Sequence, residues 1–457
     1  MKSIDVTIEK LIYGGEGLAH HDGSTVFVPL VLPGERISAE PVEQKKKFVR
    51  ARMERVIEAV PGRVAPPCRH FGICGGCDYQ HISYDAQLKF KTDILRETLR
   101  RIGRVDWTGE ITAHASPPWG YRNRAQWKVR PIADATGSSQ PNANAPADAN
   151  APNGGKRGAA SAPAPMAIGY FRANSTALCA VEECPILAPP LLKALLALRE
   201  AGAASLLPKT LREIEAFAVP GVGDGASKVQ LTATFAGFPS QGPELAELLH
   251  KIVPGLESLV FHDPSHERME LDGPGFVEYP AGGHTFRVGH FSFFQVNDFL
   301  IEELVQHTAL SEEPGRLAFD LFAGVGLFSV PLAEHFKRVV AVESNPAATR
   351  DLEINIAGQG GIDVRANDVE RFLDRSKEKP DLVLLDPPRA GLEPGSVGRL
   401  LRMAPQRITY ISCEPPTLAR DLGSLLNGGY EIAEMRLFDL FPQTFHMEAV
   451  VRLRRVK

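Results

Sequence analysis

The sequence contains few cysteines, only 6 in 457 residues. That is far too few for a fold held together by disulfide bonds, which small secreted domains use at high density. In a reducing compartment, clustered cysteines indicate metal binding, and a single cysteine beside a strand end is a candidate nucleophile. The sequence around each cysteine therefore decides how it is interpreted.

Long hydrophobic runs are also missing. No stretch reaches the roughly 18 uninterrupted apolar residues of a membrane-spanning helix, and the N-terminus, MKSIDVTIEKL, has no apolar segment like that of a secretory signal. We therefore expect a cytoplasmic protein without a membrane partner, and nothing in the sequence calls for an obligate protein partner. A hydrophobic content of 44% and a charged content of 23% are ordinary for a globular chain with several cores.

An excess of positive charge is absent too. The 51 lysines and arginines are outnumbered by 55 aspartates and glutamates, which gives a formal net charge of -4 at pH 7. Dedicated nucleic-acid-binding domains are often strongly basic, so contact with a nucleic acid would have to come from a local patch. The run QKKKFVRARMER at residues 44–55 is a candidate, and a solvated basic strand face or turn is the alternative interpretation.

The first two thirds of the chain divide into two regions. Residues 1–60 contain β-rich runs separated by glycines, a pattern typical of a small β-barrel that often serves as a nucleic-acid platform. Residues 61–285 contain a cysteine cluster, a helical stretch from Tyr84 to Ile102 and mixed α/β sequence. They also contain an Ala-, Pro- and Asn-rich insertion at about 131–165, which has too little apolar surface to form a core and is expected to be disordered.

Residues 286–457 form a third region, in which β-like runs alternate with helical intervals. The runs are RLAFDLF, RVVAVES, DLVLLDPP and ITYISCEP. Such alternation predicts a parallel, doubly wound sheet with helices on both faces. The predicted fold class is therefore α/β, with the doubly wound sheet in the C-terminal domain.

A ligand site is predicted at the first turn of this sheet. Gly324 and Gly326 lie between a hydrophobic strand and a helix, where glycine permits a tight turn and a close approach to a ligand. Glu343 closes the next strand, where a carboxylate can bind the hydroxyl pair of a ribose. Ser329 stands where a dinucleotide fingerprint has its third glycine, which favours a nucleoside cofactor without a pyrophosphate. A plain structural turn is the alternative.

The sequence DPPR at residues 386–389 follows another buried strand. The two prolines stiffen the turn and fix the Asp386 carboxylate at the carboxyl edge of the sheet, where open α/β sheets bind ligands. In methyltransferases an acidic or amide residue before two prolines is common where the acceptor base meets the methyl donor. A loop terminator without further function is the alternative.

Two strand-end residues could carry covalent chemistry. Cys413 lies between a β-rich run and a helix, and a thiol at a helix N-terminus can have its pKa lowered; a buried inert cysteine is the alternative. Glu448 enters an apolar strand, where partial desolvation could make it a base. His446, two residues away on the same strand face, is the competing base, although an exposed structural histidine is expected there.

Three cysteines with C-x5-C-x2-C spacing, Cys68, Cys74 and Cys77, indicate a metal centre. Gly75 and Gly76 let the backbone wrap around it. A fourth ligand is needed, and Cys179 and Cys184 are the candidates. Four thiolates suit either structural zinc or an iron–sulfur cluster.

The ordered motifs SFFQVN, DLFAGVGLFSVPLA, AVESN, LLDPPRAGL, YISCEP and HMEAVVRL resemble the RNA 5-methyluridine (uracil-C5) methyltransferase family over about 170 C-terminal residues. The first 60 residues resemble the TRAM domain, an OB-like barrel that many members carry. The resemblance implies a Rossmann-like methyltransferase domain that uses S-adenosylmethionine. It favours a [4Fe–4S] cluster over zinc, with Cys184 as the fourth ligand.

The resemblance also assigns roles to single residues. Cys413 matches the nucleophile that adds to uracil C6, and Glu448 matches the base that removes the C5 proton. Positions that contact the methyl donor are matched by Gln295, Phe322, Glu343, Asn367 and Asp386. Leu327 departs from the pattern, because many relatives have a polar residue there, and this puts one hydrogen bond to the donor in doubt.

The RNA that is methylated is expected to be 23S rRNA, and tRNA is the alternative. An adenine-N6 methyltransferase, which would need no nucleophilic cysteine, is a further alternative because DPP also resembles that class. A non-catalytic RNA-binding protein is the last alternative. It would use the barrel, the basic run and the side chains of Arg122, Arg124 and Trp127, with aromatic stacking on the bases.

Overall fold

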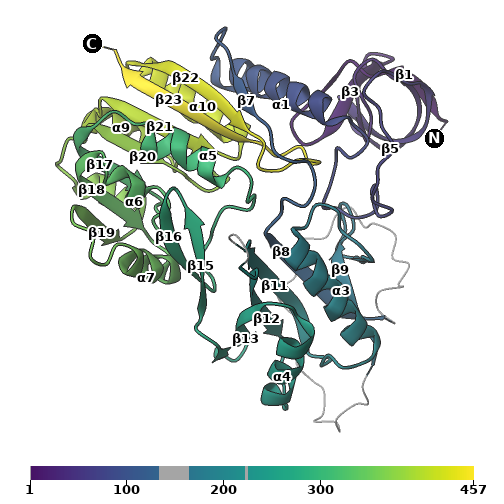
Figure 1. The fold of residues 1–457 in the computed structure, drawn as a ribbon. Helices are drawn as coiled ribbons and strands as arrows, with labels where there is room; N and C mark the ends of the chain where they lie inside the picture. Colours follow the sequence, from purple (N-terminus) through teal and green to yellow (C-terminus); the bar gives the residue numbers. More distant parts are fainter. Residues whose placement is uncertain (1, 133–163, 222–224, 457) are drawn as a thin grey trace. The chain divides into compact units, whose positions relative to one another are not determined.

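A computed structural model describes residues 2–132, 164–221 and 225–456 (Figure 1). Residues 133–163, nearly all of the insertion that was expected to be disordered, lie outside these ranges. The chain forms two compact units: the first contains Met1–Pro67, Asp78–Arg122 and Phe276–Lys457, and the second contains Cys68–Cys77 and Asn123–Gly275. The predicted barrel and the predicted methyltransferase domain thus belong to one unit, whereas the division of the chain into three functional domains stays a prediction.

The N-terminal region forms a six-stranded, barrel-like sheet in the order β1-β5-β6-β4-β3-β2. Val26, Val28 and Ile37 lie in its core with no exposed surface. Alternation of buried and exposed residues along the strands puts these side chains on one face. The strands are β1 (Ile4–Thr7), β2 (Lys10–Leu11), β3 (Glu16–His21), β4 (Ser24–Pro29), β5 (Arg36–Gln44) and β6 (Phe48–Glu58).

The basic run 44–55 covers the turn between β5 and β6 and most of β6. Several of its charges are paired within the barrel: Lys45 Nζ lies 3.0 Å from Glu43 Oε1, and Arg52 pairs with Glu40. Lys46 and Lys47 are exposed and form no ion pair with any residue that the structure describes. The basic strand face is therefore partly neutralised by its own sheet, while the exposed Arg55, like Lys46 and Lys47, forms no ion pair with any described residue.

The second unit is built on a seven-stranded sheet in the order β10-β9-β8-β11-β12-β13-β14, with helices α3 and α4. Trp127 in β8 is fully buried, and its Nε1 donates a hydrogen bond to the Tyr170 hydroxyl at 3.0 Å. Arg124 donates to Glu215 at 2.7 Å. The suggestion that Trp127 stacks on RNA bases is therefore wrong, because its indole is a core side chain. The elements are β8 (Arg124–Pro131), β9 (Met166–Phe171), β10 (Leu178–Ala180), α3 (Pro189–Ala203), β11 (Leu211–Val219), β12 (Lys228–Phe235), α4 (Gly242–Ile252), β13 (Leu256–Asp263) and β14 (Arg268–Asp272).

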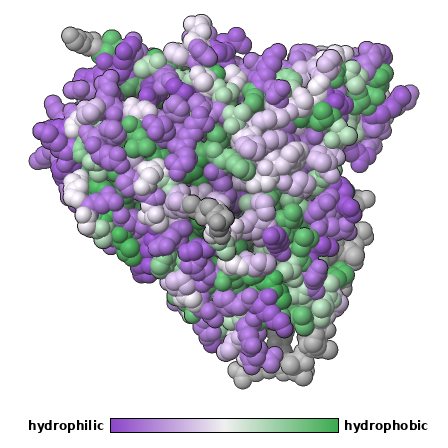
Figure 2. All heavy atoms as spheres, viewed as in Figure 1, coloured by the Kyte–Doolittle hydropathy of each residue, from purple (hydrophilic) through white to green (hydrophobic). Residues whose placement is uncertain are grey.

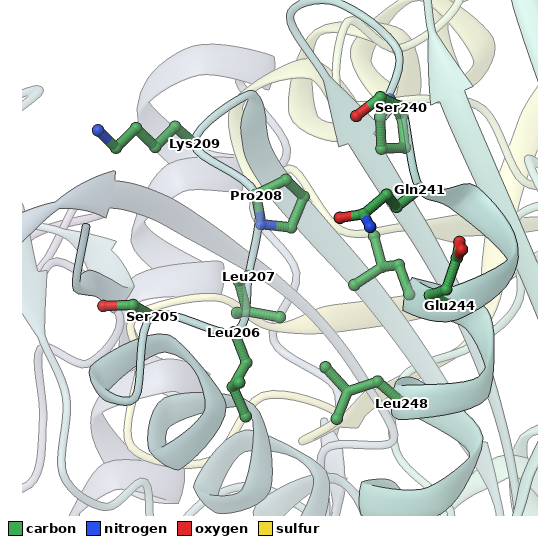
Figure 3. A pocket seen from close by; sticks show the side chains of 11 residues that line it. Ser205, Leu206, Leu207, Pro208, Lys209, Ser240, Gln241, Glu244 and Leu248 are labelled. Atoms are coloured by element: carbon green, nitrogen blue, oxygen red, sulfur yellow. The ribbon is translucent and has the colours of Figure 1, made fainter. Parts of the chain in front are cut away.

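A cavity of about 420 Å³ lies in this second unit, between the segment that follows α3 and the start of α4 (Figure 3). Its walls include Leu206, Lys209, Gln241 and Glu244. None of the predicted site residues lines it. It is therefore a feature apart from the predicted chemistry, and we assign it no function.

The C-terminal region forms an eight-stranded sheet in the order β19-β18-β17-β20-β21-β23-β22-β7. The first five strands are parallel, and β23 runs antiparallel to β21. The four predicted β-runs correspond to β17, β18, β20 and β21. The strands are β7 (Thr112–His114), β17 (Gly315–Leu321), β18 (Phe336–Glu343), β19 (Ile362–Ala366), β20 (Leu382–Leu385), β21 (Arg407–Ser412), β22 (Tyr430–Phe438) and β23 (Glu448–Arg455).

Helices cover both faces of this sheet, as the predicted doubly wound fold requires. Along β18, Val340 and Val342 pack into the main core with residues of α1, α8, α9 and α10, whereas Ala341 packs on the opposite face with Leu352 of α7. A strand buried on both faces reads as a continuous apolar run, which explains RVVAVES. The helices are α1 (Tyr84–Thr98), η1 (Leu99–Gly103), α6 (Ser329–Leu332), α7 (Pro346–Asn355), α8 (Val369–Arg375), α9 (Ser396–Met403) and α10 (Pro415–Asn427).

A hairpin and two short helices precede the sheet: β15 (Phe276–Ala281), β16 (His284–Gly289), α5 (Ile301–Val305) and η2 (Gln306–Leu310). Among the described residues, no helix is both long and apolar enough to cross a membrane. On the face of the molecule that Figure 2 shows, hydrophobic side chains are interspersed with hydrophilic ones. The predicted helical stretch from Tyr84 to Ile102 is confirmed as α1 and the π-helical turn η1.

Candidate active site

Most of the predicted site residues lie at one edge of the C-terminal sheet. Phe322 follows β17, Glu343 ends β18 and Asn367 follows β19. Asp386 follows β20 and Cys413 follows β21. Because these five strands are parallel and adjacent, their carboxyl ends meet at the same edge.

The turn after β17 is built for close approach to a ligand. Gly324 has φ +56° and Gly326 has φ +94°, both in the left-handed region that favours glycine. A Cβ on Gly326 would lie 2.7 Å from Leu352 Cδ1, so packing against α7 requires that glycine. A Cβ on Gly324 would meet nothing within 4 Å, so the backbone at Gly324 borders open space.

Glu343 is held rigidly beside this turn. Its Oε2 accepts a hydrogen bond from the Gly324 N–H at 2.8 Å, and its Oε1 accepts from the N–H groups of Ser344 and Asn345, each at 2.7 Å. The carboxylate is thus fixed between the ends of β17 and β18. It lines a cavity of about 50 Å³ whose other walls include Phe322, Asp368, Glu393 and Ser396.

The structure also explains the serine that replaces a third glycine. The Ser329 hydroxyl donates to Asp320, a fully buried carboxyl group in β17. Burial raises the pKa of Asp320 to about 7, and the serine supplies a hydrogen bond that offsets part of this desolvation cost. Leu327 is buried, with 6% of its surface exposed, so it belongs to the packing beneath the turn.

Gln295 lies in the segment between β16 and α5 and is buried, with 6% of its surface exposed. This segment is tied to α7 by a residue that the sequence analysis missed. The Gly289 N–H and the Ser292 hydroxyl both donate to Asp351 Oδ2 at 2.7 Å. Asp351 is 2% exposed, and no local sequence pattern marks it, because its burial is visible only in the fold.

Asp386, Cys413 and Glu448 come from three adjacent strands. Leu385 pairs with Tyr410 across β20 and β21, and Ser412 pairs with Ala449 across β21 and β23. Cys413 and Glu448 therefore stand one step beyond the last recorded pair of β21 and β23. Two residues that are far apart in the sequence are thus brought side by side by the antiparallel strand.

The environment of Cys413 raises the pKa of its thiol to about 12. Burial is the largest cause, the carboxyl groups of Glu448 and Asp386 follow, and the Arg389 guanidinium acts in the opposite direction. The expectation that the helix N-terminus lowers this pKa is wrong. Helix α10 begins with Pro415 and Pro416, which offer no N–H to a thiolate, while burial and the neighbouring carboxyl groups raise the pKa.

The carboxyl groups influence one another as well. Burial, then the neighbouring Asp386, raise the pKa of Glu448 well above its usual range, and Arg389 opposes them. Burial, then Asp320, raise the pKa of Asp386 to about 7. Arg389 is the nearby cation that favours the charged forms of Cys413 and Glu448, and its place directly after DPP was the signal for it.

The position and burial of His446 differ from those predicted. It precedes β23 instead of lying on it, and it is half-buried against Phe445, with ring centroids 4.2 Å apart. Burial, then the positive charges of Arg389, Lys91 and Arg122, lower the pKa of His446 to about 4. The imidazole is therefore neutral at pH 7 and a weaker base than an ordinary histidine.

The second unit brings the clustered cysteines near both candidates for a fourth ligand. Burial raises the pKa of Cys74 to about 12, and the nearby Cys179, Cys184 and Cys68 also raise it, while a backbone hydrogen bond from Gly76 lowers it. Cys179 in β10 is 5% exposed, and Cys184 is less buried. This gathering of soft sulfur donors fits a zinc ion or an iron–sulfur cluster.

His114, Glu303 and His307 form a second group of metal-binding side-chain types. His114 Nδ1 lies 2.6 Å from Glu303 Oε1, and Arg436 Nη1 lies 3.1 Å from His114 Nε2. Because the guanidinium can only donate, Nε2 accepts and Nδ1 carries the proton that is shared with Glu303. Both imidazole nitrogens are therefore engaged, and we assign no metal to this group.

The fold and this edge define the class of protein. A doubly wound sheet with a glycine turn, a carboxylate on the second strand and DPP on the fourth is a Rossmann-like methyltransferase. A family model described as "tRNA (Uracil-5-)-methyltransferase" matches residues 283–456.

Relatives match almost the whole chain. A "23S rRNA (uracil(1939)-C(5))-methyltransferase RlmD" from Klebsiella pneumoniae is 33% identical over 99% of this chain and 96% of its own. An "Uncharacterized RNA methyltransferase" from Aquifex aeolicus is 31% identical over 99% and 98%. The crystal structure of Pyrococcus abyssi tRNA (uracil-54, C5)-methyltransferase with S-adenosyl-L-homocysteine has a TM-score of 0.72, 25% identity, and covers 98% of this chain and 100% of its own. The chain belongs to the RNA uracil-C5 methyltransferase family, which decides against the adenine-N6 and non-catalytic alternatives.

Proposed function

We propose that this enzyme transfers a methyl group from S-adenosylmethionine to C5 of a uridine in 23S rRNA, through a covalent bond between Cys413 and uracil C6. One observation carries the proposal. Asp386, Cys413 and Glu448 lie together at the ends of three adjacent strands, where Asp386 and Glu448 raise the pKa of Cys413 and Asp386 also raises the pKa of Glu448.

The reaction explains why these residue types are needed. Uracil C5 is a poor nucleophile, and addition of the Cys413 thiolate to C6 turns the ring into an enolate in which C5 is reactive. The donor, when bound, supplies an electrophilic methyl group on a positively charged sulfur. Once C5 carries the methyl group, Glu448 takes the C5 proton, the C5=C6 double bond re-forms and Cys413 leaves as the thiolate. The target base has to leave its stack to reach these groups.

The donor would be held along the same edge. Glu343, fixed by backbone N–H groups beside the open space at Gly324, suits the hydroxyl pair of a ribose. Gly326 allows the tight turn. The other predicted contacts are Gln295, Phe322, Asn367 and Asp386. The Pyrococcus abyssi relative was crystallised with S-adenosyl-L-homocysteine, the product of such a donor, which supports this assignment.

The barrel and the cysteine cluster complete the proposal. We assign residues 1–60 as a TRAM-like RNA-binding domain, residues 61–285 as the cluster domain and residues 286–457 as the methyltransferase domain. Cys68, Cys74, Cys77 and Cys184 would hold a [4Fe–4S] cluster, with zinc as the alternative. The methyl-transfer chemistry needs neither, so the metal would have a structural or RNA-contacting role.

The covalent step can be tested with RNA that contains 5-fluorouridine. Fluorine at C5 prevents removal of a proton, so the wild-type enzyme and donor should form a protein–RNA adduct that survives denaturation. Cys413→Ala should form none, while it still binds the donor. RNA with ordinary uridine, which turns over, is the matched control. An adduct that persists in Cys413→Ala would overturn the proposed nucleophile.

The substrate is tested separately. Wild-type enzyme with isotope-labelled donor should place label in 5-methyluridine of unmodified 23S rRNA, because the Klebsiella pneumoniae relative that matches nearly the full chain is named for that RNA. Label confined to tRNA would favour the second candidate, which the family description and the Pyrococcus abyssi structure support. Label in methyladenosine would contradict the proposed reaction itself.

A further inference from the structure

The N-terminal barrel contributes one side chain to the neighbourhood of Cys413. Tyr13 lies in the turn between β2 and β3, where Gly14 and Gly15 have φ +103° and +85°, and the Gly15 N–H donates to the Ile12 carbonyl at 3.2 Å. The Tyr13 hydroxyl donates a hydrogen bond to Glu414 Oε2 at 2.8 Å. Glu414 directly follows Cys413, so the barrel reaches the residue beside the proposed nucleophile.

Tyr13 also touches the segment that leads to Glu448. Its ring packs edge-on against Phe445, with centroids 5.4 Å apart and an interplanar angle of 89°. The same turn approaches Phe445 at Gly15, where a Cβ would lie 3.3 Å from Phe445 Cδ1. Phe445 in turn packs on His446. One tyrosine thus contacts both segments that carry the proposed catalytic pair.

The side chain of Glu414 is available for this contact because of the prolines that follow it. Glu414 is the N-cap residue of α10, but its side chain caps no N–H of the helix. Pro415 and Pro416 remove the first donors of that helix. The Glu414 carbonyl accepts from the Leu418 N–H at 3.1 Å and from the Thr417 hydroxyl at 3.0 Å, so its backbone is fixed while its carboxylate turns to Tyr13.

We propose that Tyr13 is a positioning residue of the methyltransferase site, which holds the Glu414 carboxylate through its hydroxyl and the Phe445 segment through its ring. The inference rests on the proposed function of Cys413. Burial and the bond to Glu414 raise the pKa of Tyr13 far above its ordinary value, so the hydroxyl stays a donor. Glu414 is among the groups that raise the pKa of Cys413, and the hydrogen bond holds this charge in place and partly compensates it.

The test compares Tyr13→Phe, Glu414→Gln and the double variant. Tyr13→Phe should lower kcat about tenfold, the size expected for a lost hydrogen bond to a charged group, with little change in the KM for RNA. It should also slow alkylation of Cys413 by iodoacetamide at pH 8.5, because the uncompensated carboxylate disfavours the thiolate. Glu414→Gln should speed alkylation. In the Glu414→Gln background, Tyr13→Phe should have no further effect on alkylation.

The matched control is Tyr430→Phe, which removes a buried hydroxyl that donates to the Pro405 carbonyl at 2.7 Å. Its alkylation rate should equal that of the wild type. An unchanged rate in Tyr13→Phe, or an equal change in both backgrounds, would overturn the proposal. Peptide mass spectrometry assigns the alkylated residue without RNA or donor. Failure of the proposed function would show differently, as methyl transfer that survives Cys413→Ala.

Discussion

Cys413 and Cys74 both have a pKa raised to about 12, and burial is the largest cause for each. Their neighbours differ. Cys413 lies among the carboxyl groups of Glu448 and Asp386, and the Arg389 guanidinium opposes them. Cys74 lies among other cysteines. A nearby positive charge would favour the thiolate form of either thiol, and the neighbouring groups indicate which kind of cation each site suits.

At the cysteine cluster, several soft donors converge, so a metal can supply the charge and remain bound. At the sheet edge a single thiol faces hard oxygen groups, which suits a cationic ligand that comes and goes. The proposed donor carries such a charge on its sulfur. Two thiols with similarly raised pKa values thus have neighbours that suit different proposed roles, a structural one for Cys74 and a catalytic one for Cys413.

The largest effect is expected when one carboxyl group beside Cys413 is replaced. Glu448→Gln should lower turnover by about 10²- to 10⁴-fold, the usual contribution of a general base. Methylation should still occur, so an adduct of enzyme and methylated RNA should accumulate with ordinary uridine. Denaturing electrophoresis and mass spectrometry would detect it.

The pH dependence of the methylation rate is a second test of Glu448. In the proposed mechanism both Cys413 and Glu448 act in their deprotonated forms, and the pKa of each is raised. The wild-type rate should therefore increase with pH through the neutral range. If Glu448→Gln turned over normally, or accumulated no adduct, Glu448 would not be the base.

The site residues at the carboxyl edge of the C-terminal sheet could be predicted from the sequence, because their positions depend on where strands end. Glu343, Asp386 and Cys413 each end or follow a parallel strand, and parallel strands place such residues together whatever lies between them. The direction of the Cys413 pKa could not be predicted, because it depends on neighbours from other strands. The contact between Tyr13 and Glu414 joins residues 401 positions apart and leaves no local signal.

At the cysteine cluster, too, local sequence could not predict the fourth ligand. The spacing of Cys68, Cys74 and Cys77 is local and was recognised in the sequence. Cys179 and Cys184 are distant in sequence from that motif, and both lie near Cys74 in the fold. Trp127 shows the opposite error: a tryptophan beside arginines suggested base stacking, but the alternation of β8 turns it into the core.

An intermediate effect is expected at the cysteine cluster, where Cys184 and Cys179 are the two candidates for the fourth ligand. Cys184→Ala should lose most of the bound iron and the visible absorption of the cluster in anaerobically purified protein, because a cluster of this type needs four cysteines. Cys179→Ala is the matched control and should keep both. The opposite pattern would assign Cys179 as the ligand. Zinc in place of iron, measured by elemental analysis, would replace the cluster with the alternative metal.

The smallest effect is expected when a positively charged ligand binds beside Cys413, and it tests whether that charge favours the thiolate. A donor analogue with an amine cation in place of the sulfonium should speed alkylation of Cys413 by about tenfold, because a nearby positive charge favours the thiolate. S-adenosyl-L-homocysteine has the same shape without that charge, so it should not speed the reaction. If both ligands changed the alkylation rate equally, the shape of the ligand or ordering of the site would explain the change. The contrast with the cysteine cluster would then lose its electrostatic basis.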